Sequence, residues 1–389
     1  MSDRSVIQNA FQGWKMWLGV FIGLGVAGWM LYSNVTAVRF VEVTDGSGLY
    51  NWVDQNNNGR VELHLAEEFI PSENGVYRQQ TITDTLKHIH WTFYSVFWIL
   101  LALVFMVGRD FFYMLRIRLL TNKALSRRSS FNVIMLWEFA SALSPGVMSG
   151  AAVAMFILKR EKIQLGRSTA IVFVTAMMDN LFYVLMIPLV FLFIDHAQLF
   201  PSEMGASNGA KWIFWMGYLI YLCIALFLFS SLFLFPQLAS WLLKTIFSLP
   251  ILNRFKTGAI KTGKDIELAS RELKKEPFMF WLKTFGSTCG SWISRYLVIN
   301  ALLQAFLHLK AFDHLIILGK QFVLWLFMRM SPTPGGSGVA EYAFGELLAP
   351  FSQSALLLVG LAILWRLISY FPYLFIGAFI LPRWLKRQR

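Results

Sequence analysis

Long uncharged runs of apolar residues constrain this chain more than any other feature of its sequence. Residues 16–38, 212–243 and 347–365 contain no charged side chain, and the stretch between Lys87 and Arg109 has only two histidines as ionisable groups. The longer of these runs can cross about 30 Å of hydrocarbon as a helix. Charged residues make up only 15% of the 389 positions, against about 25% in a soluble domain. The sequence therefore predicts an all-α, polytopic integral membrane protein.

Charge in the loops predicts how the chain is oriented. Residues 38–86 hold three arginines against eight acidic residues, whereas residues 109–130, residues 244–277 and the C-terminal tail are basic. Basic loops stay on the cytoplasmic side of a bacterial inner membrane, so we expect residues 38–86 outside and both termini in the cytoplasm. Contact of these loops with anionic lipid also accounts for the net charge of +13, and no nucleic-acid partner is expected.

Two apolar stretches have flanks that do not fit a simple crossing. Residues 131–158 lie between two basic segments, and residues 315–350 must begin and end outside if the final helix returns to the basic tail. Each stretch contains a proline–glycine break, which removes a backbone donor and frees a turn. We therefore predict two re-entrant hairpins, one entering from each face, with about six crossings. The candidate turn residues are Pro145, Gly146, Gly150, Pro334, Gly335, Gly336 and Gly338.

The two predicted hairpins are similar to each other in sequence. Leu136-Trp137-x-Phe139 precedes the first break and Leu324-Trp325-x-Phe327 precedes the second, with spacings that differ by one residue. Apolar helices with a kink are common, so chance similarity is one explanation. The other is an inverted repeat, because many transporters bind their substrate where two broken elements meet.

Ionisable side chains inside apolar spans are costly, and they are functional candidates by default. The candidates are Glu138, Asp179, Arg295, Arg329, Glu341 and Arg366. In one interpretation they form ion pairs that join helices. In the other they line a polar cavity, where arginines bind a lipid phosphate and carboxylates bind a cationic headgroup or carry protons.

The acidic loop contains a partial calcium motif. Asp54, Asn56 and Asn58 occupy the first three ligand positions of a calcium loop and Gly59 the position of its glycine, but Leu65 replaces the acid expected at the end. The alternative is a turn rich in asparagine and glycine.

Residues around the second break resemble a known family. Residues 331–341 read SPTPGGSGVAE, which is similar to the PGGxGxxE signature of the lysylphosphatidylglycerol synthase transmembrane region, the flippase-like domain family. The first break, Asp179, Arg295 and the stretch from Arg366 to Pro372 also lie where we expect features of this family. The resemblance implies translocation of a modified phospholipid. The best-known members carry a fused aminoacyltransferase, which this sequence lacks, so we expect no synthase activity.

Three functions are compatible with these observations. The first is translocation of an anionic or modified phospholipid, or a lipid-linked substrate, across the inner membrane. The second is a membrane-embedded enzyme that acts on a lipid-linked substrate, with Glu138 or Glu341 as general base. The third is a structural or regulatory membrane subunit. HExxH and Walker lysine motifs are absent from the sequence, and no cofactor is expected. The prediction is therefore a lipid translocator with membrane lipids as its partners.

Overall fold

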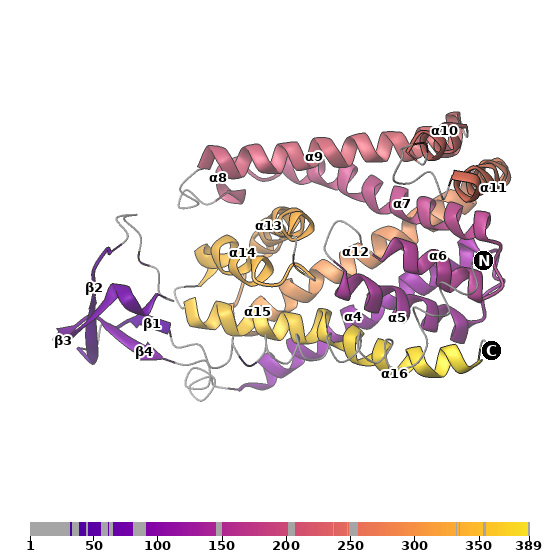
Figure 1. Ribbon diagram of the computed structural model, residues 1–389. Coiled ribbons are helices and arrows are strands. Elements are labelled where there is room, and N and C mark those ends of the chain that lie inside the picture. The colour runs from indigo at the N-terminus through magenta and orange to yellow at the C-terminus, as the bar shows by residue number, and fades with distance from the viewer. Residues whose placement is uncertain are drawn as a thin grey trace.

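Helices dominate the part of the chain that the structure, a computed structural model, describes (Figure 1). That part comprises residues 32, 39–43, 46–55, 61, 65–80, 91–144, 150–200, 207–235, 237–246, 248, 256–331, 333, 335–352 and 355–387. The predicted first span at residues 16–38 lies outside these ranges, apart from Tyr32. The helices are α4 (Phe93–Leu120), α5 (Arg127–Leu143), α6 (Ala151–Arg160), α7 (Leu165–Phe191), α8 (His196–Leu199), α9 (Ser207–Phe229), α10 (Gln237–Ile246), α11 (Lys256–Lys274), α12 (Phe278–Leu307), α13 (Ala311–Met330), α14 (Val339–Leu348), α15 (Ala355–Ser369) and α16 (Phe371–Arg387).

Five helical segments in the described ranges are long and apolar enough to cross a membrane. They are Phe93–Leu120, Leu165–Phe191, Lys211–Leu234, Ala311–Met330 and Leu357–Arg387. The last segment joins α15 and α16, which meet at Tyr370. Helix α13 is one of the five, although the sequence placed most of it in a re-entrant hairpin. The all-α, multi-pass membrane class is confirmed.

Helices α4 and α12 pack along each other through small polar residues. Thr284, Ser287, Thr288 and Ser291 are all buried on α12, and the hydroxyl of Ser291 donates to the carbonyl oxygen of Arg109 on α4 at 3.1 Å. The hydroxyls of the first three instead donate to carbonyls one turn earlier in α12. Small side chains let two membrane helices approach closely. We call this contact the α4–α12 seam.

Two pairs of helices are each interrupted at a predicted break. Helices α5 and α6 flank the first break, and α13 and α14 flank the second. The α5–α6 pair lies toward the end of the bundle that holds the C-terminus, and the α13–α14 pair lies nearer the opposite end (Figure 1). Gly150 begins α6 with φ +62°, and a Cβ there would lie 2.9 Å from the backbone nitrogen of Ser141. Glycine is therefore required where α6 returns beside α5.

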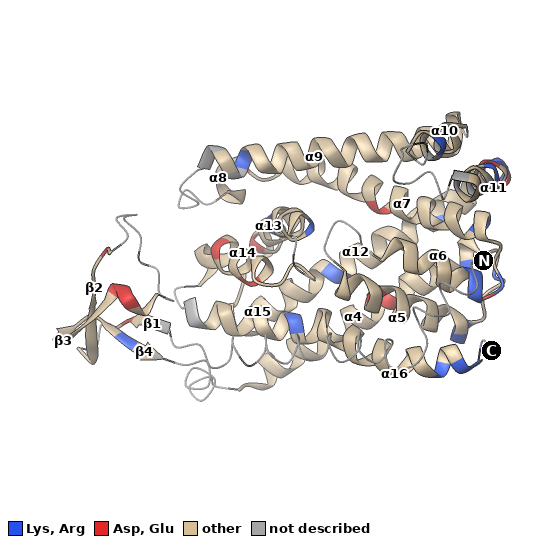
Figure 2. Ribbon diagram, in the orientation of Figure 1, with Lys and Arg blue, Asp and Glu red and all other residues tan. Residues whose placement is uncertain are grey.

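A four-stranded antiparallel sheet occupies part of the predicted acidic loop, in the order β1-β4-β2-β3. Its strands are β1 (Arg39–Glu42), β2 (Gly48–Trp52), β3 (Phe69–Gly75) and β4 (Tyr77–Gln80). Phe40, Phe69 and Tyr77 form a small core, and Val41 packs against Ile363 of α15. Figure 2 shows lysine and arginine gathered at the end of the bundle farthest from this sheet. The sheet thus lies at one end of the helices and most of the positive charge at the other.

Candidate functional site

A cavity of about 210 Å³ lies among residues of both interrupted helix pairs and of α4, α7, α9, α12, α15 and α16. Trp137 and Trp325, the tryptophans shared by the two similar sequences, both line it. The candidates that line it are Glu138, Asp179, Arg295, Arg329, Gly335, Gly336 and Arg366. Segments far apart in sequence therefore bring most of the predicted charged residues to one polar space inside the membrane part of the fold.

The first charged cluster is centred on Arg109 of α4, which is 1% exposed. Its Nη1 lies 2.9 Å from Oδ1 of Asp110, and its Nη2 lies 2.7 Å from Oε2 of Glu138 on α5. Tyr373 of α16 accepts a hydrogen bond from Arg109 and donates one to Asp110. The ring of Tyr113 lies 4.6 Å from the Cζ of Arg109. Glu138 is thus held in a network that joins three helices.

The second cluster pairs Asp179 of α7 with Arg116 of α4. Arg116 Nη1 lies 2.5 Å from Oδ1 of Asp179, and the indole nitrogen of Trp292 donates to the same oxygen at 2.9 Å. Arg116 also donates to the hydroxyl of Thr288 across the α4–α12 seam. A buried ion pair needs such additional hydrogen bonds, because removing two charges from water is costly. The partner of Asp179 in this structure is Arg116 rather than Arg295.

Arg109 and Arg116 are site residues that the sequence analysis did not identify. It assigned them to a basic cytoplasmic segment at residues 109–130, whereas α4 continues to Leu120 and both arginines are buried. The signal that could have found them is their helical spacing. Arg109, Tyr113 and Arg116 follow one another at i, i+4 and i+7, which places them on one face of a helix.

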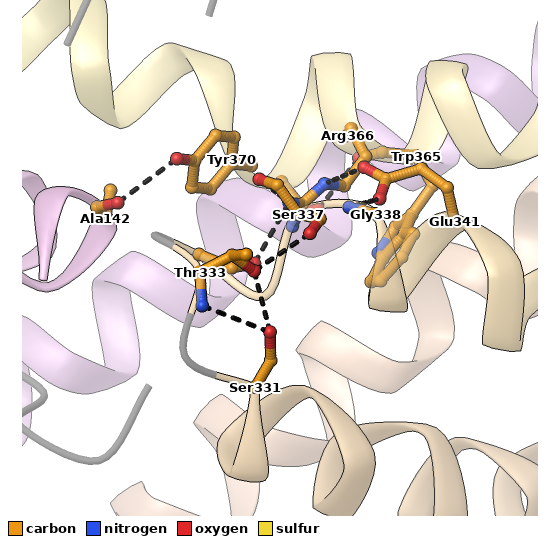
Figure 3. Close-up of polar contacts among 11 residues, drawn as sticks. Ala142, Ser331, Thr333, Ser337, Gly338, Glu341, Trp365, Arg366 and Tyr370 are labelled. Atoms are coloured by element: carbon orange, nitrogen blue, oxygen red, sulfur yellow. Dashed lines mark hydrogen bonds and ion pairs between the residues drawn. The ribbon is translucent and has the colours of Figure 1, made fainter. Parts of the chain in front are cut away.

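The third cluster holds the second break (Figure 3). The Nε of Arg366 donates to Oε1 of Glu341 at 2.9 Å, and its Nη2 donates to the carbonyl oxygen of Gly335 and the hydroxyl of Ser337, each at 3.0 Å. Its Cζ lies 4.2 Å from the ring centroid of Tyr370. Most of the hydrogen-bonding capacity of Arg366 is therefore used to fasten the loop between α13 and α14.

The N-terminus of α14 is occupied by the chain itself. Oε2 of Glu341 accepts from the backbone nitrogen of Gly338 at 2.6 Å, which caps the helix. Gly335, Gly336 and Gly338 have φ of +60°, +68° and +83°, values that favour glycine. The predicted turn residues Pro145, Gly146 and Pro334 lie outside the described residues.

Arg295 of α12 and Arg329 of α13 differ from the other arginines of the site. Their Cζ atoms lie 4.9 Å and 5.5 Å from the ring centroid of Trp325. The Nε of Arg329 donates to the hydroxyl of Tyr221 at 2.7 Å. Within the described ranges, neither guanidinium has a carboxylate partner. The two cations beside one indole leave several donors for a ligand.

Asp54, the described member of the candidate calcium motif, does not line this cavity. Asp54 lies in the loop after β2, and Asn56 and Asn58 lie outside the described residues. Among the residues searched, no group of three or more histidine, cysteine or acidic side chains has the arrangement of a metal site.

The region that matches a known family includes every residue that lines the cavity. Residues 78–377 match the family described as the lysylphosphatidylglycerol synthase TM region. The chain belongs to this family. It is also similar to a "UPF0104 membrane protein" of Archaeoglobus fulgidus, with 24% identity over 290 residues that cover 72% of this chain and 85% of that protein. No solved structure matches the chain. The family resemblance read from residues 331–341 is therefore confirmed.

Proposed function

We propose that this protein translocates an anionic lipid across the membrane, with the lipid phosphate bound between Arg295 and Arg329. The observation that carries the proposal is this pair of arginines, which line a cavity without an acidic partner in the described structure. An arginine inside a bilayer costs at least about 2.5 kcal/mol unless it is paired or hydrated. A phosphate supplies the missing charge and accepts two hydrogen bonds from a planar guanidinium.

Two further observations support translocation over simple binding. The cavity lies between two interrupted helix pairs, an arrangement that many transporters use to alternate access to a central site. The family name refers to a phospholipid synthase, and residues 78–377 of this chain correspond to its membrane region. The tryptophans at equivalent positions of the two pairs, Trp137 and Trp325, support an inverted repeat around the cavity.

The proposed orientation follows from the distribution of charge. Lysine and arginine gather at the end of the bundle opposite the sheet (Figure 2). Positive loops are retained in the cytoplasm, so we place that end there and the sheet outside a bacterial inner membrane.

Proteoliposomes test the proposal. The full chain is reconstituted with fluorescent phosphatidylglycerol, and the label on the outer leaflet is quenched with dithionite. Wild-type protein should accelerate the loss of protected fluorescence. Arg295→Gln and Arg329→Gln should each slow it by roughly tenfold to a hundredfold, because a hydrogen bond to a charged group contributes about 1.5–3 kcal/mol. Neither change strands a carboxylate in the described structure, so both variants should keep their thermal stability.

Arg271 provides a matched control. Its side chain is 60% exposed on α11 and pairs with Glu267 one turn earlier. Arg271→Gln removes the same charge outside the cavity and should leave translocation unchanged. Translocation at the wild-type rate in both cavity variants would refute the proposed phosphate site.

The same vesicles distinguish the alternative functions. A translocator changes the distribution of the labelled lipid between leaflets and leaves its mass unchanged. An enzyme converts the lipid to a product of different mass, and a structural subunit does neither. Mass spectrometry of the extracted lipid therefore accompanies the fluorescence measurement.

A further inference from the structure

One buried arginine, Arg109, faces two carboxylates, and one of them, Glu138, lines the cavity. Arg109 contacts Asp110 at 2.9 Å and Glu138 at 2.7 Å. One positive charge against two negative charges leaves this triad with an excess of one negative charge when both acids are ionised. By contrast, Arg116 with Asp179 and Arg366 with Glu341 are one-to-one pairs.

Within the described residues, no second cation lies within ion-pair distance of either carboxylate of the triad. On α4, the ring of Tyr113 lies 4.6 Å from the Cζ of Arg109 and also 4.6 Å from that of Arg116. On α16, the hydroxyl of Tyr373 lies between Arg109 and Asp110. On α12, Ser291 contributes a neutral hydroxyl that donates to the backbone of Arg109. Arg116 is already engaged by Asp179 of α7.

The charge of a carboxylate that lacks a cationic partner in a low-dielectric site is removed most simply by protonation. We infer that the Asp110–Arg109–Glu138 triad takes up one proton from water when the cavity binds its anionic lipid. The proton adds to a carboxylate oxygen of the triad and forms a neutral carboxyl group. An O–H bond of a hydronium ion breaks as the carboxyl O–H bond forms, and no other bond changes. Both carboxylates contact the same guanidinium, so the proton is assigned to the triad and not to one residue.

The positions of the cavity residues explain how a proton can enter the triad and why lipid binding favours its uptake. The side chain of Glu138 is 22% exposed and lines the cavity, so its carboxylate is open to that space. Arg295 and Arg329 line the same cavity. A lipid phosphate bound there therefore adds negative charge near the triad, and uptake of a proton removes the repulsion between them.

The coupling is reciprocal. If a bound proton strengthens lipid binding, bound lipid strengthens proton binding by the same factor. Unit charges on the order of 10 Å apart, at an effective dielectric constant of about 20, change a binding constant roughly tenfold. This inference rests on the proposed function, and it adds that the lipid is bound together with a proton.

Calorimetry on the full chain in detergent tests the coupling. Short-chain phosphatidylglycerol is titrated into the protein in buffers of equal pH but different ionisation enthalpy. The dependence of the observed heat on the buffer gives the number of protons taken up for each lipid bound. We expect uptake that approaches one proton at the pH where the effect is largest, and an affinity that rises roughly tenfold as the pH falls through that region.

Two variants test where the proton binds, and a third variant is the control. Glu138→Gln and Asp110→Asn should each lower proton uptake while the lipid still binds, because Arg295 and Arg329 remain. Glu267→Gln removes a carboxylate that pairs with an arginine outside the cavity and should leave proton uptake unchanged.

Several outcomes would overturn the inference. Lipid binding to the wild-type protein without any change in bound protons is one, and it does not depend on the folding of a variant. Undiminished uptake in both triad variants is another. Tighter binding of phosphatidylethanolamine without proton uptake would mean that the triad binds an ammonium group instead. If no anionic lipid binds at all, the proposed function is wrong, and the inference that rests on it is wrong as well.

Discussion

Gly335 is the residue of the second break whose substitution should be most costly. A Cβ at Gly335 would lie 2.2 Å from Cε2 of Tyr370. That ring cannot move freely, because its hydroxyl donates to the carbonyl oxygen of Ala142 at 3.1 Å and its face lies against Arg366. Gly336 has a similar positive φ, but its Cβ would lie 3.1 Å from the side chain of Met328. This contact is tight, yet it requires a much smaller displacement of the neighbouring atoms than the contact at Gly335.

The comparison of the two alanine variants separates backbone strain from collision. A non-glycine residue in this backbone region costs about 1–3 kcal/mol, and overpacking adds about 1–3 kcal/mol. Gly335→Ala should therefore lower the free energy of unfolding by roughly 2–6 kcal/mol. Gly336→Ala should lower it by roughly 1–3 kcal/mol, from backbone strain with a smaller steric contribution.

Equilibrium unfolding in mixed micelles of mild detergent and SDS, followed by tryptophan fluorescence, measures these losses. Combining Gly335→Ala with Tyr370→Leu removes the aromatic edge, so the double variant should lose less than the sum of the two single variants. Equal losses for Gly335→Ala and Gly336→Ala, together with additivity in the double variant, would refute the proposed collision.

Three further predictions concern the helices. Arg366→Gln strands its carboxylate partner and should cost about 3–5 kcal/mol, and replacing that partner with glutamine as well should restore much of the loss in the same unfolding assay. Gly377→Ala should destabilise more than Gly360→Ala, because a Cβ at the first would lie 2.3 Å from Phe139 and at the second would meet nothing within 4 Å. Cysteines at the exposed positions Lys123 and Gln164, in a background without the native cysteines, should both be labelled from the cytoplasmic side. Labelling from opposite sides would show that residues 131–158 do not form the re-entrant hairpin predicted from loop charge.

The sequence predicted the class of the protein and both breaks because these depend on local signals. Apolar runs of membrane length can be recognised without knowing which helices pack beside them. A proline–glycine break limits the local backbone in the same way. Arg366 and Glu341 were candidates because both are ionisable residues in apolar stretches, and they form an ion pair at 2.9 Å.

The partners of the charged residues could not be predicted in this way. Pairing depends on which helix faces meet, so Asp179 bonds to Arg116 and not to Arg295. A loop-charge rule counts every arginine of a basic stretch alike, and it therefore assigned Arg109 to the cytoplasm although it is buried against Glu138 of α5. The sheet was missed for a related reason, because its core of three aromatic residues is too small to give a strong pattern.

In the proposed translocation cycle, the α4–α12 seam determines which parts of the protein can serve as a fixed reference. Its hydroxyls bond largely within their own helix, so the two helices are held by close fit along their length and a sliding movement would have to break that fit at many points. Arg116 and Arg295 project from these two helices, whereas Glu138 and Arg329 belong to the interrupted pairs. Pairs of spin labels on α4 and α12 should therefore keep one distance throughout a cycle, and displacement of the interrupted helices is best measured against them. Arg116 and Arg295 would then stay still while Glu138 and Arg329 move past them.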